Sequence, residues 1–329
     1  GTENGLLIIN PAEPNEMSVQ CRHDSRNPTS LANNVVWSLF VDPYGNVWAG
    51  TEMGVSIANL DSPVTAVSLA DITNRFDGQQ VYSMLRDSHG DFWLGGTNGV
   101  IRIPDGAAPA QWFMPGNRMR DLSHSRVRRI YESSAGDLLV AGDGGLNRFD
   151  RAKGHFDNYR ITDRSHRYMA NWIYGVVEDT ARAELWTGSY LGGVMATALD
   201  KFRPGGGTVV ADSLLKCSNS SAGDLISDIV SDIRGNKWVL LFRDSTVYRI
   251  DAHSGISKSV DIKDATGYYP TAITRDRQGR IWVAHSYGAV MLGADGSIES
   301  KVDFSDIPSA IENEGVSAFA PVGKEIWVA

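Results

Sequence analysis

One motif recurs seven times along this chain and constrains its fold more than any other feature. Each copy resembles Gly-Asn-Val-Trp-Ala-Gly-Thr at 45–51, and successive copies lie 44 to 52 residues apart. Six of the nine tryptophans fall in one aligned column of these copies, which chance does not produce. Internal periods of this length are typical of propellers and other repeat folds. The aligned residues are Trp48, Trp93, Leu139, Trp186, Trp238, Trp282 and Trp327.

Every copy contains the same sequence of short elements. An apolar strand such as 81–87 is followed by a tight turn with Asp and Gly, such as 276–279, and then by the strand that carries the aligned column. A glycine ends that strand, and two further strands complete about 45 residues, without helical periodicity. We therefore predict an all-β fold, a seven-bladed β-propeller of four-stranded blades, formed by residues 1–329 as a single domain.

The two ends of the chain indicate how the ring closes. The chain stops at 326–329, midway through a repeat, and residues 2–7 continue the motif when they are joined to that end. We expect residues 2–10 to pair with residues 324–329, so that N- and C-terminal strands share one blade and leave no open sheet edge. Gly1 stands outside the match, which suggests that the chain is a fragment of a longer multidomain protein.

Composition excludes several classes of protein. The net charge of −8 argues against a nucleic-acid partner, which would require a basic domain. No run of apolar residues is long enough to cross a membrane, so no membrane contact is expected. Cys21 and Cys217 lack the spacing of a metal site, and one distant pair is not a disulfide framework.

Two repeated columns are interpreted as structural. One large aromatic residue per blade fills the wedge between neighbouring sheets, so the tryptophans are expected to be buried. An aspartate also recurs where each tight turn begins, where its side chain bonds the local backbone rather than forming a carboxylate ring. These aspartates are Asp42, Asp87, Asp179, Asp232 and Asp276.

The motif resembles the two-component regulator propeller repeat, most clearly at 35–55, 81–100 and 270–290. Such propellers are similar to those in the periplasmic half of hybrid two-component sensor histidine kinases of Bacteroides-type bacteria. The resemblance implies a periplasmic sensor that detects a glycan and signals to a kinase outside this chain. It also implies a neighbouring propeller or immunoglobulin-like domain as partner, and a possible homodimer of the whole receptor. The chain departs from the pattern at Leu240–Arg243 in blade 5 and at Leu139 in blade 3.

Two other function classes remain open. No nucleophile elbow, phosphate loop or metal-binding motif is present, so we expect no catalysis, cofactor or metal site. A propeller can still gather distant residues at its axis, and His285, close to Tyr287, is the best starting point for a propeller enzyme such as a lyase. A protein-interaction scaffold without a small ligand is the third interpretation.

The candidate ligand site lies on the axial face, where the loops that enter the inner strands meet those between the second and third strands. Aromatic rings, arginines and polar side chains there suit a saccharide, which has many hydroxyl groups and apolar CH faces. The competing interpretation is that they are ordinary loop and packing residues. The candidate residues are His124, Arg126, Arg164, Arg167, Tyr168, Trp172, Tyr190, Tyr268, Tyr269 and Tyr287.

The arginines also suggest the charge of the ligand. Stretches 118–129 and 160–167 are rich in Arg and His although the chain is acidic overall, and they lead into consecutive blades. Because alternate residues of a strand point to opposite faces, Arg128 and Arg129 are not both expected in a basic rim. We expect the rim to favour an oligosaccharide with uronate or sulfate groups. The competing interpretation pairs these arginines with acidic neighbours or with another domain.

Overall fold

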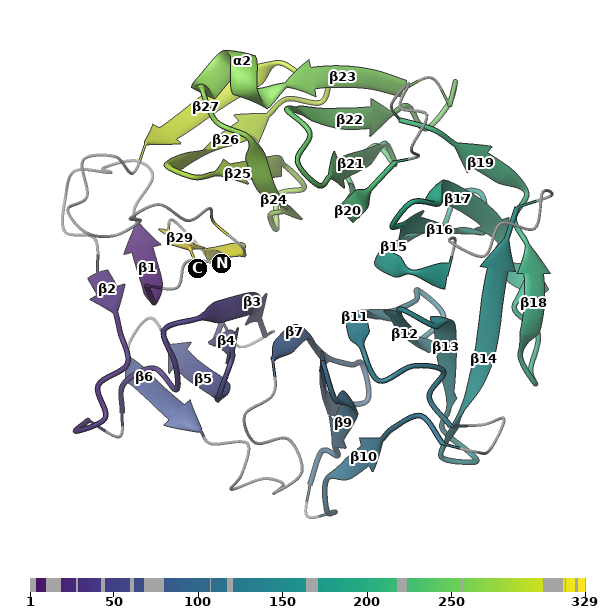
Figure 1. Ribbon diagram of the computed structural model, residues 1–329, viewed down its shortest axis with the longest axis horizontal. Coiled ribbons are helices and arrows are strands. Elements are labelled where there is room, and N and C mark those ends of the chain that lie inside the picture. The colour runs from purple at the N-terminus through teal and green to yellow at the C-terminus, as the bar shows by residue number, and fades with distance from the viewer. Residues whose placement is uncertain are drawn as a thin grey trace.

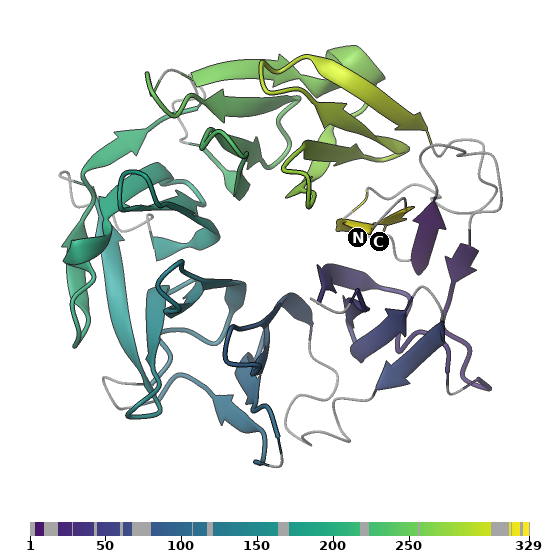
Figure 2. The ribbon, with the colours of Figure 1, turned by 180° about the vertical axis from the view of Figure 1, so that it is seen from behind.

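In the computed structural model, seven β-sheets stand like blades around a central axis and close into a ring (Figures 1 and 2). This confirms the predicted all-β, seven-bladed propeller. The structure describes residues 4–9, 19–27, 29–42, 45–59, 62–67, 80–106, 108–116, 121–163, 171–217, 224–255, 257–303, 316, 318–322 and 325–328.

Strand order runs outwards from the axis in each of the first three blades. Blade 1 contains β3 (Val36–Val41), β4 (Val47–Thr51), β5 (Gly54–Asn59) and β6 (Ser62–Val67). Blade 2 contains β7 (Val81–Arg86), β8 (Phe92–Gly96), β9 (Gly99–Ile103) and β10 (Gln111–Phe113). Blade 3 contains β11 (Val127–Glu132), β12 (Leu138–Gly142), β13 (Gly145–Asp150) and β14 (His155–Thr162).

The next three blades repeat this order. Blade 4 contains β15 (Ile173–Asp179), β16 (Glu184–Ser189), β17 (Gly193–Ala198) and β19 (Ser213–Leu215). Blade 5 contains β20 (Ile226–Ser231), β21 (Lys237–Leu241), β22 (Thr246–Ile250) and β23 (Ser257–Asp261). Blade 6 contains β24 (Pro270–Arg275), β25 (Ile281–His285), β26 (Gly288–Leu292) and β27 (Ile298–Asp303).

Blade 7 joins the two ends of the chain, in the order β28 (Phe319–Val322), β29 (Glu325–Val328), β1 (Leu6–Ile9) and β2 (Val19–Cys21). β1 pairs antiparallel with β29, with Leu7 opposite Val328 and Ile8 opposite Trp327. Figure 1 shows purple β1 beside yellow β29. The predicted closure is therefore confirmed for the described residues of both ends.

One strand departs from the four-stranded plan. The connection from β17 to β19 includes a short 3-10 helix, η2 (Leu199–Lys201), and then β18 (Gly207–Val210). β18 leaves blade 4 and pairs in parallel with β14, so the sheet of blade 3 has five strands (Figure 1). A second short helix, α2 (Ile262–Thr266), follows β23 and starts at an Asp261 cap. The longer repeat of blade 4 thus accounts for the extra strand.

The tryptophan and aspartate columns form one structural unit. The indole N–H of Trp93 donates to Oδ2 of Asp87 at 2.7 Å, and Oδ1 of Asp87 accepts the backbone N–H of Asp91 at 3.0 Å. Trp93 itself has no exposed surface. The same indole-to-carboxylate bond, at 3.0 to 3.1 Å, recurs in blades 1, 5 and 6. Each aspartate therefore closes its turn and holds the tryptophan of the following strand.

Blade 4 replaces this unit with a buried ion pair. Asp179 accepts a hydrogen bond from the ammonium of Lys237 in blade 5 at 2.8 Å, and Trp186 donates to Glu184 instead. Only 2% of the Lys237 side chain is exposed. Blades 4 and 5 are thus joined by a charge pair through the aspartate that holds an indole in blades 1, 2, 5 and 6.

Candidate functional site

The inner strands share an irregularity that determines which side chains reach the axis. In each of the six inner strands from β3 to β24, the pairing with the next strand skips one residue near the start. Such a bulge places two residues opposite one, so two consecutive side chains turn towards the axis. The skipped residues are Trp37, Tyr82, Arg128, Tyr174, Ser227 and Thr271.

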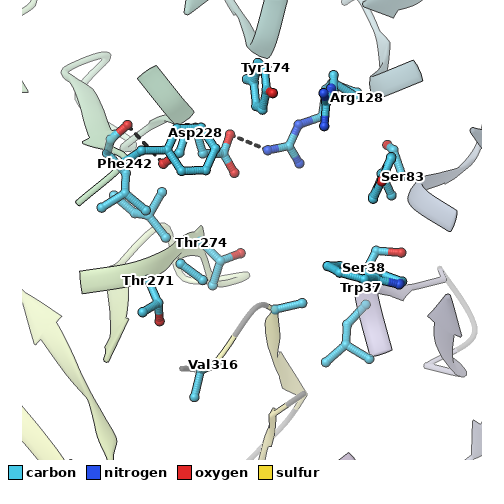
Figure 3. Close-up of a pocket in the computed structure, with 18 of the residues that line it drawn as sticks. Trp37, Ser38, Ser83, Arg128, Tyr174, Asp228, Phe242, Thr271, Thr274 and Val316 are labelled. Carbon is cyan, nitrogen blue, oxygen red and sulfur yellow. Dashed lines mark hydrogen bonds and ion pairs between the residues drawn. The ribbon is translucent and has the colours of Figure 1, made fainter. Parts of the chain in front are cut away.

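All six skipped residues line a pocket of about 510 Å³ on the propeller axis (Figure 3). The pocket is asymmetric. Blades 1 to 5 contribute rings and charged groups, whereas blades 6 and 7 contribute small side chains such as Thr271, Thr274 and Val316. Figure 3 shows Thr271 and Thr274 beside Asp228 and Phe242, and Tyr174 across the pocket from Val316.

Five aromatic side chains form an arc, here called the aromatic crescent. Tyr174 lies 5.7 Å from Tyr190 and 5.4 Å from Phe242, measured between ring centroids. Trp37 and Tyr82 pack edge to face at 5.9 Å on the other side of Arg128. Burial raises the pKa of both Tyr82 and Tyr174, which keeps their phenols neutral. The crescent is therefore an uncharged wall with polar edges.

Arg128 joins the two halves of the crescent. Its guanidinium lies 4.3 Å from the ring centroid of Tyr174 and 5.5 Å from that of Tyr82. Nε and Nη2 of Arg128 donate to the two carboxylate oxygens of Asp143 at 2.9 and 3.2 Å. This bidentate pair fixes the guanidinium and compensates its charge.

Arg129 reaches in a different direction and forms an ion pair with Asp228 of blade 5. The pair crosses in front of blade 4, where the corresponding residue is Gly175. A Cβ atom there would lie 3.2 Å from Oδ1 of Asp228 and 2.6 Å from Cγ2 of Ile229. Gly175 is therefore the residue that leaves space for a contact between blades 3 and 5.

The expectation that Arg128 and Arg129 would not share one surface is wrong. Both line the axial pocket, because the bulge between Val127 and Arg129 interrupts the alternation on which the expectation rested. Each of these two arginines has an aspartate partner, Asp143 for Arg128 and Asp228 for Arg129. Arg126 remains half exposed, 3.7 Å from Asp143.

A second aromatic cluster lies on blade 6. The ring of His285 stacks on Tyr268 at 5.5 Å with an interplanar angle of 5°, and Tyr268 contacts Tyr287 at 4.8 Å. Burial lowers the pKa of His285 to about 4, so the imidazole is neutral at pH 7. The charge of Asp303 acts in the opposite direction and is outweighed by burial. The described residues include no group of three or more metal-binding side chains.

The predicted site residues that the structure describes are not among those that line the pocket. Nδ1 of His124 accepts the backbone N–H of Arg126, and Trp172 packs on Tyr190 at 5.8 Å. Tyr190 is the one predicted residue that belongs to the crescent. The hydroxyl of Tyr269 accepts from Lys263 at 2.9 Å. Arg164, Arg167 and Tyr168 lie outside the described residues.

The residues that line the pocket were not predicted, because the candidate site was placed on loops and these residues lie mainly on inner strands. The signal was nevertheless present, since a large side chain follows the first apolar residue of four consecutive inner strands, at 36–37, 81–82, 127–128 and 173–174. The departure of blade 5 from the motif was a second signal. It places Phe242 in the crescent.

The model of the two-component regulator propeller family matches residues 30–53 and 75–98. The repeat that the sequence resembles is therefore confirmed there. A sequence comparison with curated proteins gave no match. No helix in the described part of the chain is long and apolar enough to cross a membrane.

Three solved structures illustrate what the fold is similar to. The first is described as the extracellular domain of the hybrid two-component system BT4673 of B. thetaiotaomicron, with 33% identity, a TM-score of 0.72 and 100% of this chain covered. The chain spans only 44% of that domain. A second such domain, BT3049 of the same organism, has 15% identity and a TM-score of 0.63, with 90% of this chain and 40% of that one covered. Virginiamycin B lyase of Staphylococcus aureus has 14% identity and a TM-score of 0.62, with 98% of each chain covered, and shares the fold alone.

Proposed function

We propose that this chain is a ligand-sensing propeller from the extracytoplasmic, periplasmic half of a two-component sensor histidine kinase. The regulator propeller repeat and the 33% identity to an extracellular domain of that class support this assignment. Because the chain spans 44% of that domain, the remaining sensor domains, the membrane segment and the kinase would lie outside it. Its activity would be to couple ligand binding to that distant kinase.

The ligand is proposed to be a glycan bound in the axial pocket. The observation that carries this proposal is the aromatic crescent, four of whose five rings line the pocket beside hydrogen-bonding Arg, Asp, Ser and Thr side chains. Saccharide rings present apolar CH faces that pack on aromatic rings, and hydroxyl groups that bond polar side chains. A pocket of about 510 Å³ falls in the usual size range of small-molecule sites.

Features of blade 6 disfavour the lyase alternative. A propeller lyase needs a histidine and a carboxylate or metal that converge on one substrate. His285 is covered by Tyr268 instead. The similarity to a lyase at 14% identity concerns the fold alone and supplies no catalytic residue. We therefore propose a sensor without catalysis of its own.

The partners of the chain are proposed to belong to the same receptor. A neighbouring propeller or immunoglobulin-like domain would contact this chain, and two receptors would associate as a homodimer. In this arrangement the axial pocket supplies the ligand-dependent signal and the other domains transmit it.

Calorimetric titration tests the glycan proposal. The probes are neutral oligosaccharides (xylo-, manno-, cello- and fructo-oligosaccharides) and oligogalacturonates, each titrated into the purified chain. We expect one class to bind and the double variant Y174A/F242A to lose that binding. The matched control, Tyr269→Ala, removes an aromatic ring that is 46% exposed and outside the pocket, and should bind as the wild type does. The absence of binding by every probe would count against the proposal, as would binding that survives Y174A/F242A.

A further inference from the structure

We infer that Asp228 is the specificity-determining residue of the axial pocket and that it restricts the pocket to uncharged saccharide rings. This inference rests on the proposed glycan-binding function. The arginines of the sequence led to the expectation of an acidic ligand. The present inference differs because the structure shows the carboxylates that pair with Arg128 and Arg129.

The first step concerns the charges of the pocket. Its charged lining residues, among those the structure describes, are Arg128, Arg129 and Asp228. Asp143 adds a second carboxylate directly behind Arg128, at 2.9 Å. Each guanidinium of the lining thus has a carboxylate partner, although Asp143 also lies 3.7 Å from Arg126 outside the lining.

The second step concerns where a ligand anion would have to lie. Arg128 is held between two rings, and its Nε and Nη2 donate to the two oxygens of Asp143, so a carboxylate already compensates its charge. Arg129 is more accessible, with 36% of its side chain exposed. However, Asp228 already occupies the position opposite it. A uronate that approached Arg129 would also approach Asp228, and like charges repel.

The third step concerns what the pair offers to a neutral ring. A guanidinium has five N–H donors, and a carboxylate has about four acceptor positions, so a single ion pair leaves several of them available. Part of both side chains stays exposed, 36% for Arg129 and 19% for Asp228. One sugar hydroxyl can accept from Arg129 while its neighbour donates to Asp228. Hydrogen bonds to charged partners are the stronger kind.

The fourth step concerns where a saccharide ring would lie in the pocket. Asp228 lies on the same side of the pocket as Tyr174 and Phe242 (Figure 3). Thr271 and Thr274 of the neighbouring blade 6 line the pocket beside them and add hydroxyl groups to this part of the wall. A saccharide whose CH face packs on Tyr174 or Phe242 would therefore direct its edge hydroxyls to the Arg129–Asp228 pair.

Gly175 supports the same arrangement. A Cβ atom at this position would lie 3.2 Å from Oδ1 of Asp228 and 2.7 Å from the backbone N of Ile229, so a side chain there would crowd both the carboxylate and its donor. Ile229 also fixes the carboxylate, since its backbone N–H donates to Oδ1 of Asp228 at 2.7 Å. The acceptor is therefore positioned before a ligand arrives.

Calorimetry with Asp228→Asn tests the inference, because this variant keeps the shape of the side chain and removes its charge. Neutral oligosaccharides should bind the variant about tenfold or more weakly, the loss expected for one hydrogen bond to a charged group. Oligogalacturonates, which should not bind the wild type, should gain about tenfold or more in affinity through the uncovered Arg129. The control Asp150→Asn changes the net charge equally, at a residue that pairs with Lys153 on the outer surface, and should leave both affinities unchanged.

A measurement on the wild type keeps the inference falsifiable if Asp228→Asn does not fold. Binding of a neutral oligosaccharide should change less than about twofold between 50 and 500 mM NaCl, because salt screens ionic contacts and not contacts of an uncharged ring. Preferential, salt-sensitive binding of oligogalacturonate to the wild type would overturn the inference and leave the glycan-binding function intact. If neither class of probe binds, the proposed function itself fails.

Discussion

Replacing Asp179 by Ala removes one member of the buried pair that joins blades 4 and 5. Only 2% of the Lys237 side chain is exposed, and its ammonium would lose the carboxylate that lies 2.8 Å away. Breaking a buried pair in this way costs about 3–5 kcal/mol, since an uncompensated charge stays buried. Lys237 keeps two other contacts, the carbonyl of Gly235 and the ring of Trp186 at 5.1 Å. We therefore expect the lower end of the range, about 3 kcal/mol.

Equilibrium unfolding in urea, followed by tryptophan fluorescence, measures this loss. The double variant D179A/K237M replaces the pair with apolar groups and should recover most of the lost stability, because no charge then remains buried. The control is Asp200→Ala, which removes a carboxylate at an exposed residue of η2 and should not change the midpoint measurably. A loss below about 1 kcal/mol in D179A would refute the reasoning. So would a double variant that is as unstable as D179A.

The same pair predicts a dependence on pH. Burial by itself raises the pKa of Asp179, but the hydrogen bond and charge of Lys237 outweigh this and hold the pKa below its usual value. A carboxyl with a lowered pKa stabilises the folded state above its unfolded pKa of about 3.9, and the contribution is lost as the pH falls. The difference in stability between wild type and D179A should thus be complete at pH 7 and shrink below about pH 4.

Three further predictions concern the ends, the core and the blade 6 cluster. Deletion of residues 2–10 removes β1 from blade 7 and bares β29, which should cost several kcal/mol; an unchanged melting temperature would contradict the closure. Trp93→Ala should cost about 3–5 kcal/mol by urea unfolding, whereas Trp172→Ala, at a ring that is 40% exposed, should cost far less. The imidazole of His285 should titrate by NMR near pH 4, so its contribution to stability is lost as the pH falls below about 6.5; a midpoint near 6.5 would show that the ring is solvated.

Much of the fold could be predicted because it depends on local, repeated chemistry. The tryptophan column reveals the blade period, and the Asp–Gly turns reveal the strand boundaries, since each residue has the same role in every copy. The match between residues 2–7 and the motif identifies the closing blade. None of these inferences requires knowledge of what lies beyond one blade and its neighbours.

The candidate site depends on contacts between blades, which the repeat does not encode. A one-residue bulge turns both Arg128 and Arg129 to the axis, and a sequence read with strict alternation excludes that outcome. Asp228 meets Arg129 only because the ring brings blades 3 and 5 together across Gly175. The sequence by itself determined the number of blades, their closure and their packing residues, because these follow from periodicity and turn chemistry. Only the tertiary structure decided which arginines keep an uncompensated charge, because charge compensation depends on distances between residues that are far apart in the chain.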